Sequence, residues 1–248
     1  MNAIEARDLA QQIAARVRAG EIERAYAQLA PILAQRTPFP KLGLIGAGVG
    51  DQPGRELTAF LDRIAADRTE GGWVVIGRAL GQQLERDLAG AFDRCWCHII
   101  AGDVWYCADI LAERVSGPAL VAHFGPAVDL LTPWRQDDNV WVRRAVGVAV
   151  HFWAKRSRGV LELRHQAEAL LGLLKPMFEE WEMDSVKGVG WGLKTLGRHY
   201  PDLVADWIAT EIVPNQRRHR ALMLRKALTY LSPQQRAVSY THLRAHET

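Results

Sequence analysis

The feature that most constrains the fold of this chain is the spacing of its apolar residues, which is helical along almost the whole sequence. Residues 3–18 carry such a stripe through Ile4, Leu9, Ile13 and Val17, and this spacing places side chains on one helix face. The same spacing predicts helices over residues 21–35, 54–67, 72–87, 89–101, 103–115, 118–131, 139–155, 160–174, 184–199, 201–210 and 216–231. No segment shows the sustained alternation of a half-buried strand. The sequence therefore predicts an all-α protein.

About a dozen helices joined by short links indicate an α-α superhelical solenoid of paired helices. No clean repeat of fixed length is visible, so an irregular globular helical domain is the alternative on pattern alone. We expect a single domain over residues 1–233. The residues after Ser232-Pro233 do not continue the pattern, and we expect residues 234–248 to be a disordered or non-native tail.

A glycine-rich stretch, LIGAGVGD at residues 44–51, is similar to a dinucleotide-binding loop only in composition. Asp51 stands where the third glycine of G-x-G-x-x-G belongs, and no βαβ pattern surrounds it. We interpret the stretch as a connecting loop and expect no nucleotide cofactor.

The composition excludes several classes of protein. With 48% hydrophobic and 24% charged residues the chain is typical of a soluble globular protein. No apolar run reaches the roughly 18 residues of a membrane span, and the first residues lack the apolar core of a signal peptide. Three cysteines within thirteen residues do not indicate a disulfide framework. We therefore expect a cytoplasmic protein with no membrane partner.

A metal site is a weak alternative for the segment that holds these cysteines. Cys95, Cys97, His98 and Cys107 are possible ligands, but C-x-C-H lacks the usual zinc spacing, and two helical residues two apart point about 200° apart. We expect buried thiols and no metal.

Basic residues cluster although the formal net charge is only +3. One cluster is Arg143, Arg144, Lys155, Arg156 and Arg158, and the other is Arg217, Arg218, Arg220, Arg225 and Lys226. Both clusters fit phosphate contacts, and both fit solvated helix ends.

Tryptophan is unusually frequent, with 9 residues, and three of them form pairs with a charged residue at helical spacing. Core packing is the interpretation for Trp153, Trp181 and Trp207. The three pairs, each sharing one helix face, are Trp105 with Asp109, Trp141 with Arg144, and Trp191 with Lys194. Each pair alone is also compatible with a core tryptophan beside a solvent-facing charge.

Together the pairs suit the cleavage of a glycosidic bond in DNA. Indoles attract a cation or stack on a base or sugar, and a carboxylate between them stabilises the positive charge that develops on the sugar. Cations beside them hold phosphates. An N3- or N7-alkylated purine is already cationic and leaves without a proton, so one carboxylate suffices.

Three segments carry a family resemblance: W-Y-C-A-D at 105–109, D-N-V-W-V-R-R-A-V at 138–146, and V-G-W-G-L-K followed by P-D-L-V at 189–204. In this order they resemble the signature helices of the AlkD-type family of HEAT-like DNA alkylpurine glycosylases, best over residues 90 to 231. The resemblance implies a HEAT-like fold, Asp109 as the catalytic aspartate, Trp105 and Trp191 as aromatic cleft residues, and Arg144 as a phosphate contact. It also implies removal of N3- and N7-alkylpurines by an enzyme that grips the backbone and does not draw the base into a pocket, unlike most base-acting enzymes.

The chain departs from the family pattern at several positions. Lys194 replaces the usual arginine, which keeps the charge but loses the two-pronged grip on phosphate. Arg143 adds a cation beside Arg144. The N-terminal third matches poorly, and Tyr26 does not match the tyrosine of typical members.

The hypothesis from the sequence is a metal-independent, monomeric DNA glycosylase that acts on double-stranded DNA containing alkylated bases. Asp109, Trp105 and Trp191 are its candidate catalytic residues, and the candidate DNA-binding residues are Arg144, Lys194, Arg143 and Trp141. The alternative is a non-catalytic HEAT-like scaffold that binds damaged or branched DNA or a protein partner. Asp109 discriminates between them, because a binder of a polyanion gains nothing from an anion in its cleft.

Overall fold

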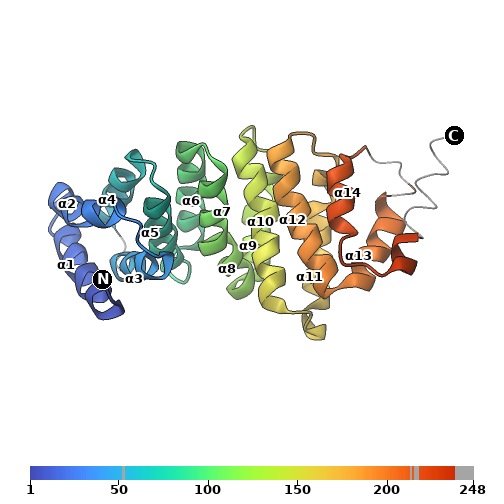
Figure 1. The fold of residues 1–248 in the computed structure, drawn as a ribbon, viewed down its shortest axis with the longest axis horizontal. Coiled ribbons are helices and arrows are strands. Elements are labelled where there is room, and N and C mark those ends of the chain that lie inside the picture. Colours follow the sequence, from blue (N-terminus) through green and yellow to red (C-terminus); the bar gives the residue numbers. More distant parts are fainter. Residues whose placement is uncertain (52–53, 213, 215–217, 238–248) are drawn as a thin grey trace. The chain divides into compact units, whose positions relative to one another are not determined.

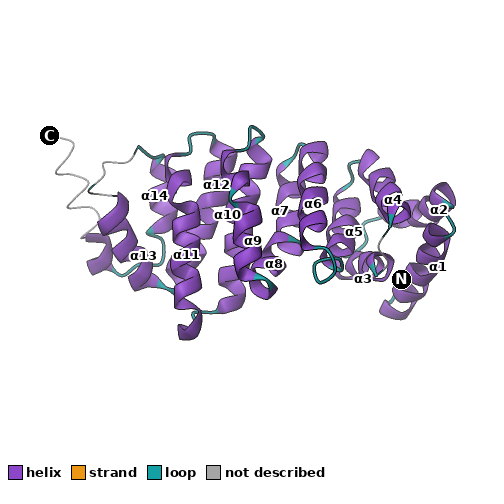
Figure 2. Cartoon of the chain, turned by 180° about the vertical axis from the view of Figure 1, so that it is seen from behind, coloured by secondary structure: helices purple, strands orange, loops and turns teal. Residues whose placement is uncertain are grey.

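The computed structural model describes residues 1–51, 54–212, 214 and 218–237. These residues form helices and loops without a strand, as Figure 2 shows, so the all-α prediction is confirmed. The chain divides into two compact units, Met1–Val115 and Ser116–Thr248. The predicted single domain over residues 1–233 stays a prediction.

The described residues of unit 1, residues 1–51 and 54–115, form seven helices in two rows. Helices α1, α3, α5 and α7 pack successively on one another, and α2, α4 and α6 form the second row (Figure 1). This pairing of rows is that of an α-α solenoid. The bounds are α1 Ala3–Arg18, α2 Ile22–Leu33, α3 Phe39–Gly50, α4 Arg55–Ala66, α5 Glu70–Gly81, α6 Leu88–Gly102 and α7 Trp105–Arg114.

Unit 2, from residue 116 on, repeats this arrangement. Helices α8, α10, α12 and α14 pack in one row, and α11 lies between α9 and α13 in the other. The α-helices are α8 Ser116–Ala122, α9 Phe124–Leu131, α10 Val140–Ser157, α11 Arg164–Leu174, α12 Met183–His199, α13 Pro201–Trp207 and α14 Ala221–Ala227. Short 3-10 segments (η1 Pro133–Gln136, η2 Leu161–Leu163, η3 Lys175–Glu179) and one π-helical turn (η4 Ile208–Ile212) join them.

The interpretation of residues 44–51 as a loop is wrong, because residues 44–50 form the second half of α3 and Asp51 is its C-cap residue. Their glycines allow close packing on α5. A Cβ at Gly46 would lie 2.4 Å from the carbonyl oxygen of Val75, and one at Gly50 would lie 2.4 Å from the Cα of Ala79. Tertiary packing outweighs the low helix propensity of glycine here.

The predicted helix over residues 118–131 is divided into α8 and α9. Pro126 lies in the first turn of α9, and the residue four before it, Ala122, ends α8. A proline ring clashes with the carbonyl group four residues earlier, so one continuous helix is excluded.

Two other predicted segments differ in extent. The helix predicted over 72–87 ends at Gly81 and continues as turns, and the last one begins at Ala221 in the described residues. Residues 233–237 form a further helical turn, capped by Ser232 and Gln235. The remainder of the predicted tail, residues 238–248, lies outside the described residues. In the part of the chain that the structure describes, no helix is long and apolar enough for a membrane span.

Candidate functional site

Trp105 and Asp109 lie on α7 of unit 1, one helical turn apart, as predicted. Trp105 is the first residue of the helix and is 52% exposed, with its ring edge-on to Tyr106 at a centroid distance of 5.7 Å. Asp109 is half-buried. The opposite face of α7 is buried through Cys107 and Leu111. Trp105 is therefore not a core tryptophan, and it shares its face with a carboxylate.

In unit 2, glycines in and directly beside the family segments let α10 and α12 approach backbone to backbone. A Cβ at Gly147 would lie 2.4 Å from the backbone of Gly188, and one at Gly192 would lie 2.6 Å from the carbonyl oxygen of Gly147. Side chains cannot occupy such contacts, so glycine is required at these positions. The motif residues beside these glycines are consequently held on two closely packed helices.

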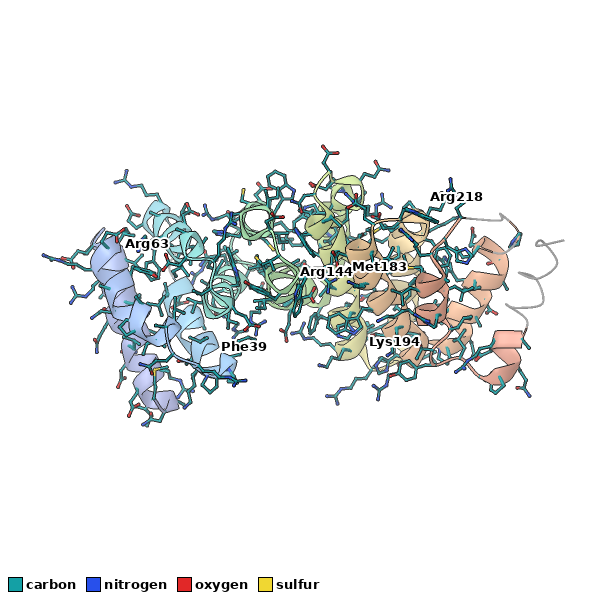
Figure 3. All side chains as sticks on the ribbon, turned by 45° about the horizontal axis from the view of Figure 1, so that its top comes forward. Phe39, Arg63, Arg144, Met183, Lys194 and Arg218 are labelled. Carbon is teal, nitrogen blue, oxygen red and sulfur yellow. The ribbon has the colours of Figure 1, made fainter. Side chains whose placement is uncertain are left out.

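Arg144 and Lys194 are brought to the same region of unit 2, on α10 and α12 (Figure 3). Arg144 is only 8% exposed, and its Nη1 donates to the carbonyl oxygen of Asp184 at 3.0 Å. Lys226 on α14 joins them, since its Cβ would contact a Cβ placed at Gly190 on α12 at 3.2 Å. Burial lowers the pKa of Lys226, and repulsion from Lys194, Arg144 and Arg225 lowers it further.

We call Arg144, Lys194 and Lys226 the cation cluster. Like charges held together on a rigid scaffold gain from an anion between them. The sequence shows Lys226 only as one of several clustered cations, because its contact with α12 comes from residues far away in the chain.

Arg143 has a different environment from Arg144. Its guanidinium pairs with Glu180 at 2.7 Å and with Glu182 at 3.0 Å, and it also donates to the carbonyl oxygens of Asp137 and Asp138. These contacts join α10 to the segment before α12. The phosphate contact predicted for Arg143 stays a prediction, but its charge is already compensated.

Trp141 lies half-buried in the first turn of α10. The Asn139 side chain caps this turn by accepting from the backbone nitrogens of Trp141, at 2.9 Å, and Val142. Trp141 and Arg144 are three residues apart on this helix, as predicted, so they share a face.

Trp191 on α12 stacks on a histidine that the sequence pattern did not indicate as a site residue. The ring of His151, on α10, lies 3.8 Å from the Trp191 ring between centroids, with 22° between the planes. His151 is 8% exposed, and burial, followed by repulsion from Lys155, lowers its pKa to about 4. The available sequence signal was spacing, because His151 follows Arg144 by two helical turns.

Of the tryptophans predicted to lie in the core, Trp153 and Trp207 are buried. The prediction for Trp181 is wrong, since it is 50% exposed and Arg220 and Arg218 lie over its ring at 4.1 Å and 5.5 Å. Trp181 lies in the loop before α12 and not within a helix.

The thiols lie as predicted for two of the three cysteines: Cys95 and Cys107 are buried, whereas Cys97 is exposed. Burial raises the pKa of the Cys95 and Cys107 thiols, which disfavours thiolates. Among the described residues, no group of three or more His, Cys, Asp or Glu side chains could hold a metal ion.

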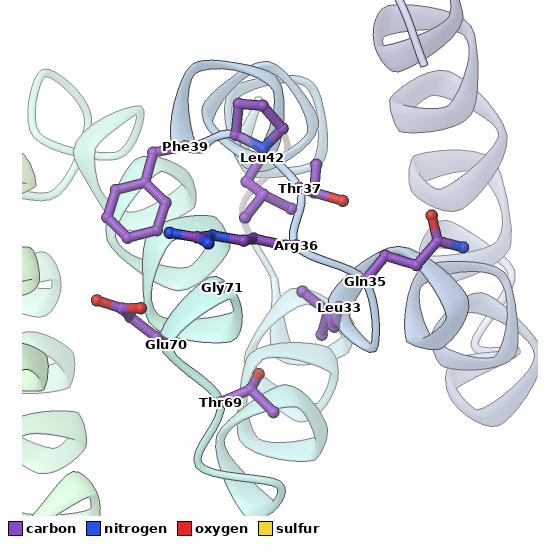
Figure 4. Close-up of a pocket in the computed structure, with 10 residues that line it drawn as sticks. Leu33, Gln35, Arg36, Thr37, Phe39, Leu42, Thr69, Glu70 and Gly71 are labelled. Carbon is purple, nitrogen blue, oxygen red and sulfur yellow. The ribbon is translucent and has the colours of Figure 1, made fainter.

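A cavity of about 490 Å³ in unit 1 lies between the segment before α3 and the start of α5 (Figure 4). It combines apolar side chains such as Phe39 and Leu42 with Arg36 and Glu70. None of the predicted site residues lines this cavity.

The family model of the DNA alkylation repair enzymes matches residues 74–231, well over half of the chain. No curated protein and no solved structure matches the chain significantly. The matched range includes every predicted site residue, from Trp105 on α7 to Lys194 on α12, as well as Lys226. The chain therefore belongs to the DNA alkylation repair enzyme family, with a role in DNA repair and with DNA as its substrate.

Proposed function

We propose that this enzyme is a DNA glycosylase that hydrolyses the N-glycosidic bond of cationic N3- and N7-alkylpurines in duplex DNA. The observation that carries the proposal is the half-buried carboxylate of Asp109, one helical turn from the exposed indole of Trp105. A protein that only binds DNA gains nothing from an anion in its binding surface. An enzyme that generates a cation on the sugar does gain from such an anion, because the carboxylate stabilises the developing positive charge.

The reaction needs no acid to help the base leave. When the bond between C1′ and the purine nitrogen breaks, its electron pair passes to the cationic base, which departs neutral. The sugar becomes an oxocarbenium-like cation, and the carboxylate of Asp109 stabilises it. Water then adds to C1′ and loses a proton, for which Asp109 is the acceptor and orienting group. The products are a free alkylpurine and an abasic site.

The tryptophans and the cation cluster have separate roles in this proposal. Trp105 and Trp191 each present an indole, and indole faces attract positive charge, which suits contact with the deoxyribose or with the cationic base. Arg144, Lys194 and Lys226 hold backbone phosphates, which positions the duplex without reading its sequence. We further propose that the enzyme acts as a monomer in the cytoplasm and without a metal or other cofactor.

The test is release of N7-methylguanine and N3-methyladenine from methylated duplex DNA by the wild-type chain and by Asp109→Asn. We expect wild-type release, and loss of about 10²–10³-fold in rate in Asp109→Asn because one transition-state stabiliser is removed. DNA affinity of the variant should be kept or increased. Tight DNA binding by the wild type without release of either base would contradict the glycosylase and favour the non-catalytic scaffold.

A further inference from the structure

His151 and Trp191 form a supported stack within unit 2. The two rings come from different helices, α10 and α12, and their separation of 3.8 Å and angle of 22° describe a face-to-face contact. Phe152 adds an edge contact to the indole at 6.0 Å. One face of the Trp191 indole is thus occupied by the imidazole, so only its opposite face can receive a ligand.

A hydrogen-bond chain fixes the imidazole in this position. The Thr195 hydroxyl donates to the backbone carbonyl of Trp191 at 3.1 Å, and His151 Nδ1 lies 2.7 Å from the same hydroxyl oxygen. When the hydroxyl hydrogen serves the carbonyl, Nδ1 is the donor in the second bond, which is the arrangement of the tautomer protonated at Nδ1. These two hydrogen bonds link the imidazole of His151 to the helical turn that carries Trp191.

The stack is also uncharged. His151 is buried against its neighbours, and Lys155, one turn along α10, further opposes its protonation. A neutral ring beneath the indole leaves the electron-rich opposite face able to attract a cation, whereas an imidazolium ring would repel it. The charge state and the geometry therefore favour the same ligand, a cationic base or sugar.

We propose that His151, fixed by Thr195, is a positioning residue that sets the orientation of Trp191 for the transition state. The proposal rests on the glycosylase function proposed above. His151 acts through the indole and does not itself contact the DNA. Small displacements of a positioned group cost about 10²-fold in rate, so the effect belongs to the chemical step rather than to DNA affinity.

The experiment compares His151→Ala, which removes the platform, with His151→Phe, which keeps a flat ring but not the hydrogen bond, and with Thr195→Val. Single-turnover release at saturating enzyme gives the rate, and titration of labelled duplex gives Kd. We expect His151→Ala to lose about 10–100-fold in rate with Kd within about twofold. His151→Phe should recover most of the rate, and Thr195→Val should lie between them.

A second readout separates positioning from folding. The ¹⁵N-indole resonance of Trp191, assigned with Trp191→Phe, should shift or broaden in His151→Ala while the melting temperature shows a folded chain. An unchanged rate and an unmoved indole resonance in folded His151→Ala would overturn the proposal. A rate loss matched by an equal rise in Kd, without rescue by His151→Phe, would also overturn it.

Failure of the proposed function is distinguishable from failure of this inference. If the wild-type chain releases no base, the glycosylase proposal fails, and the indole resonance decides the positioning role alone. In that case a displaced Trp191 indole resonance in both His151→Ala and Thr195→Val supports the positioning of Trp191 by His151 and Thr195. An unmoved resonance refutes it.

Discussion

In unit 1 the candidate catalytic pair lies on the single helix α7, whereas in unit 2 the candidate DNA contacts are spread over α10, α12 and α14. Both units pack these helices through glycine. A Cβ at Gly81 on α5 would lie 2.6 Å from the carbonyl oxygen of Arg114 on α7, much as Gly147 meets Gly188 in unit 2. The candidate site residues of the two units differ in charge. Unit 1 holds the carboxylate of Asp109, whereas unit 2 holds the cation cluster of three basic residues.

From this difference we expect Asp109 in unit 1 to act on the rate and the cation cluster in unit 2 to act on DNA affinity. An anion stabilises the sugar cation but opposes binding of DNA, while cations hold phosphates and contribute little to bond cleavage. Substitution of Asp109 in unit 1 should therefore change the rate of base release, and substitutions in the cation cluster of unit 2 should change DNA affinity.

The largest effect is expected from Gly147→Val, which forces a side chain into the contact of α10 with α12. The Cβ alone would lie 2.4 Å from the Gly188 backbone, so the helices must move apart, and overpacking of this kind costs about 3 kcal/mol or more in the free energy of unfolding. Chemical denaturation measures this. The matched control is Gly172→Ala on α11, where nothing lies within 4 Å of the new Cβ, and a gain of about 0.5–1 kcal/mol is expected. Equal stability of the two variants would show that the close contact is not needed.

A smaller effect is expected from the double variant Lys194→Ala and Lys226→Ala. Loss of two phosphate contacts should weaken duplex binding by about 10–100-fold and reduce the slope of log K against log salt by about 1.8. The single-turnover rate at saturating enzyme should change little. Titrations at several salt concentrations measure the slope. A reduced rate with unchanged salt dependence would contradict the assignment of these lysines to phosphates.

Each unit contains a buried histidine whose protonation should lower the free energy of unfolding as the pH falls. Burial lowers the pKa of His98 in unit 1 and of His151 in unit 2 from 6.5 to about 4. Between about pH 6.5 and pH 4 the unfolded chain binds protons that the folded chain does not, so stability present above pH 6.5 is lost as the pH falls.

For each histidine the loss at pH 5 is about 1–2 kcal/mol. Unfolding at pH 7 and pH 5 should therefore show a smaller difference in His98→Phe and in His151→Phe than in the wild type. The same pH dependence in wild type and variants would show that other groups cause it.

The smallest effect is expected from Lys194→Arg, which restores the residue typical of the family. A planar guanidinium gains a two-pronged contact with phosphate, and we expect DNA affinity to rise by about two- to fivefold. Competition binding against the wild type measures this. A fall in affinity would instead indicate that the cluster with Lys226 is shaped for an ammonium group.

Local pattern determined most of the helices and the pairing of residues within each of them, but not α3 or the break between α8 and α9. Trp105 with Asp109 and Trp141 with Arg144 share a helix face because three- and four-residue spacings do so in any α-helix. The family segments at Trp105, Trp141 and Trp191 were also visible in the chain and agree with the family match.

Only the tertiary structure decided which helices approach one another. Residues 44–50 are helical, and Gly46 and Gly50 pack against α5, a contact with residues about thirty positions away that no local pattern contains. The stack of His151 on Trp191, the placement of Lys226 in the cation cluster and the pairing of Arg143 with Glu180 all join separate helices. Spacing along the sequence fixes side-chain direction within one helix, whereas the partners of that side chain depend on how the helices pack.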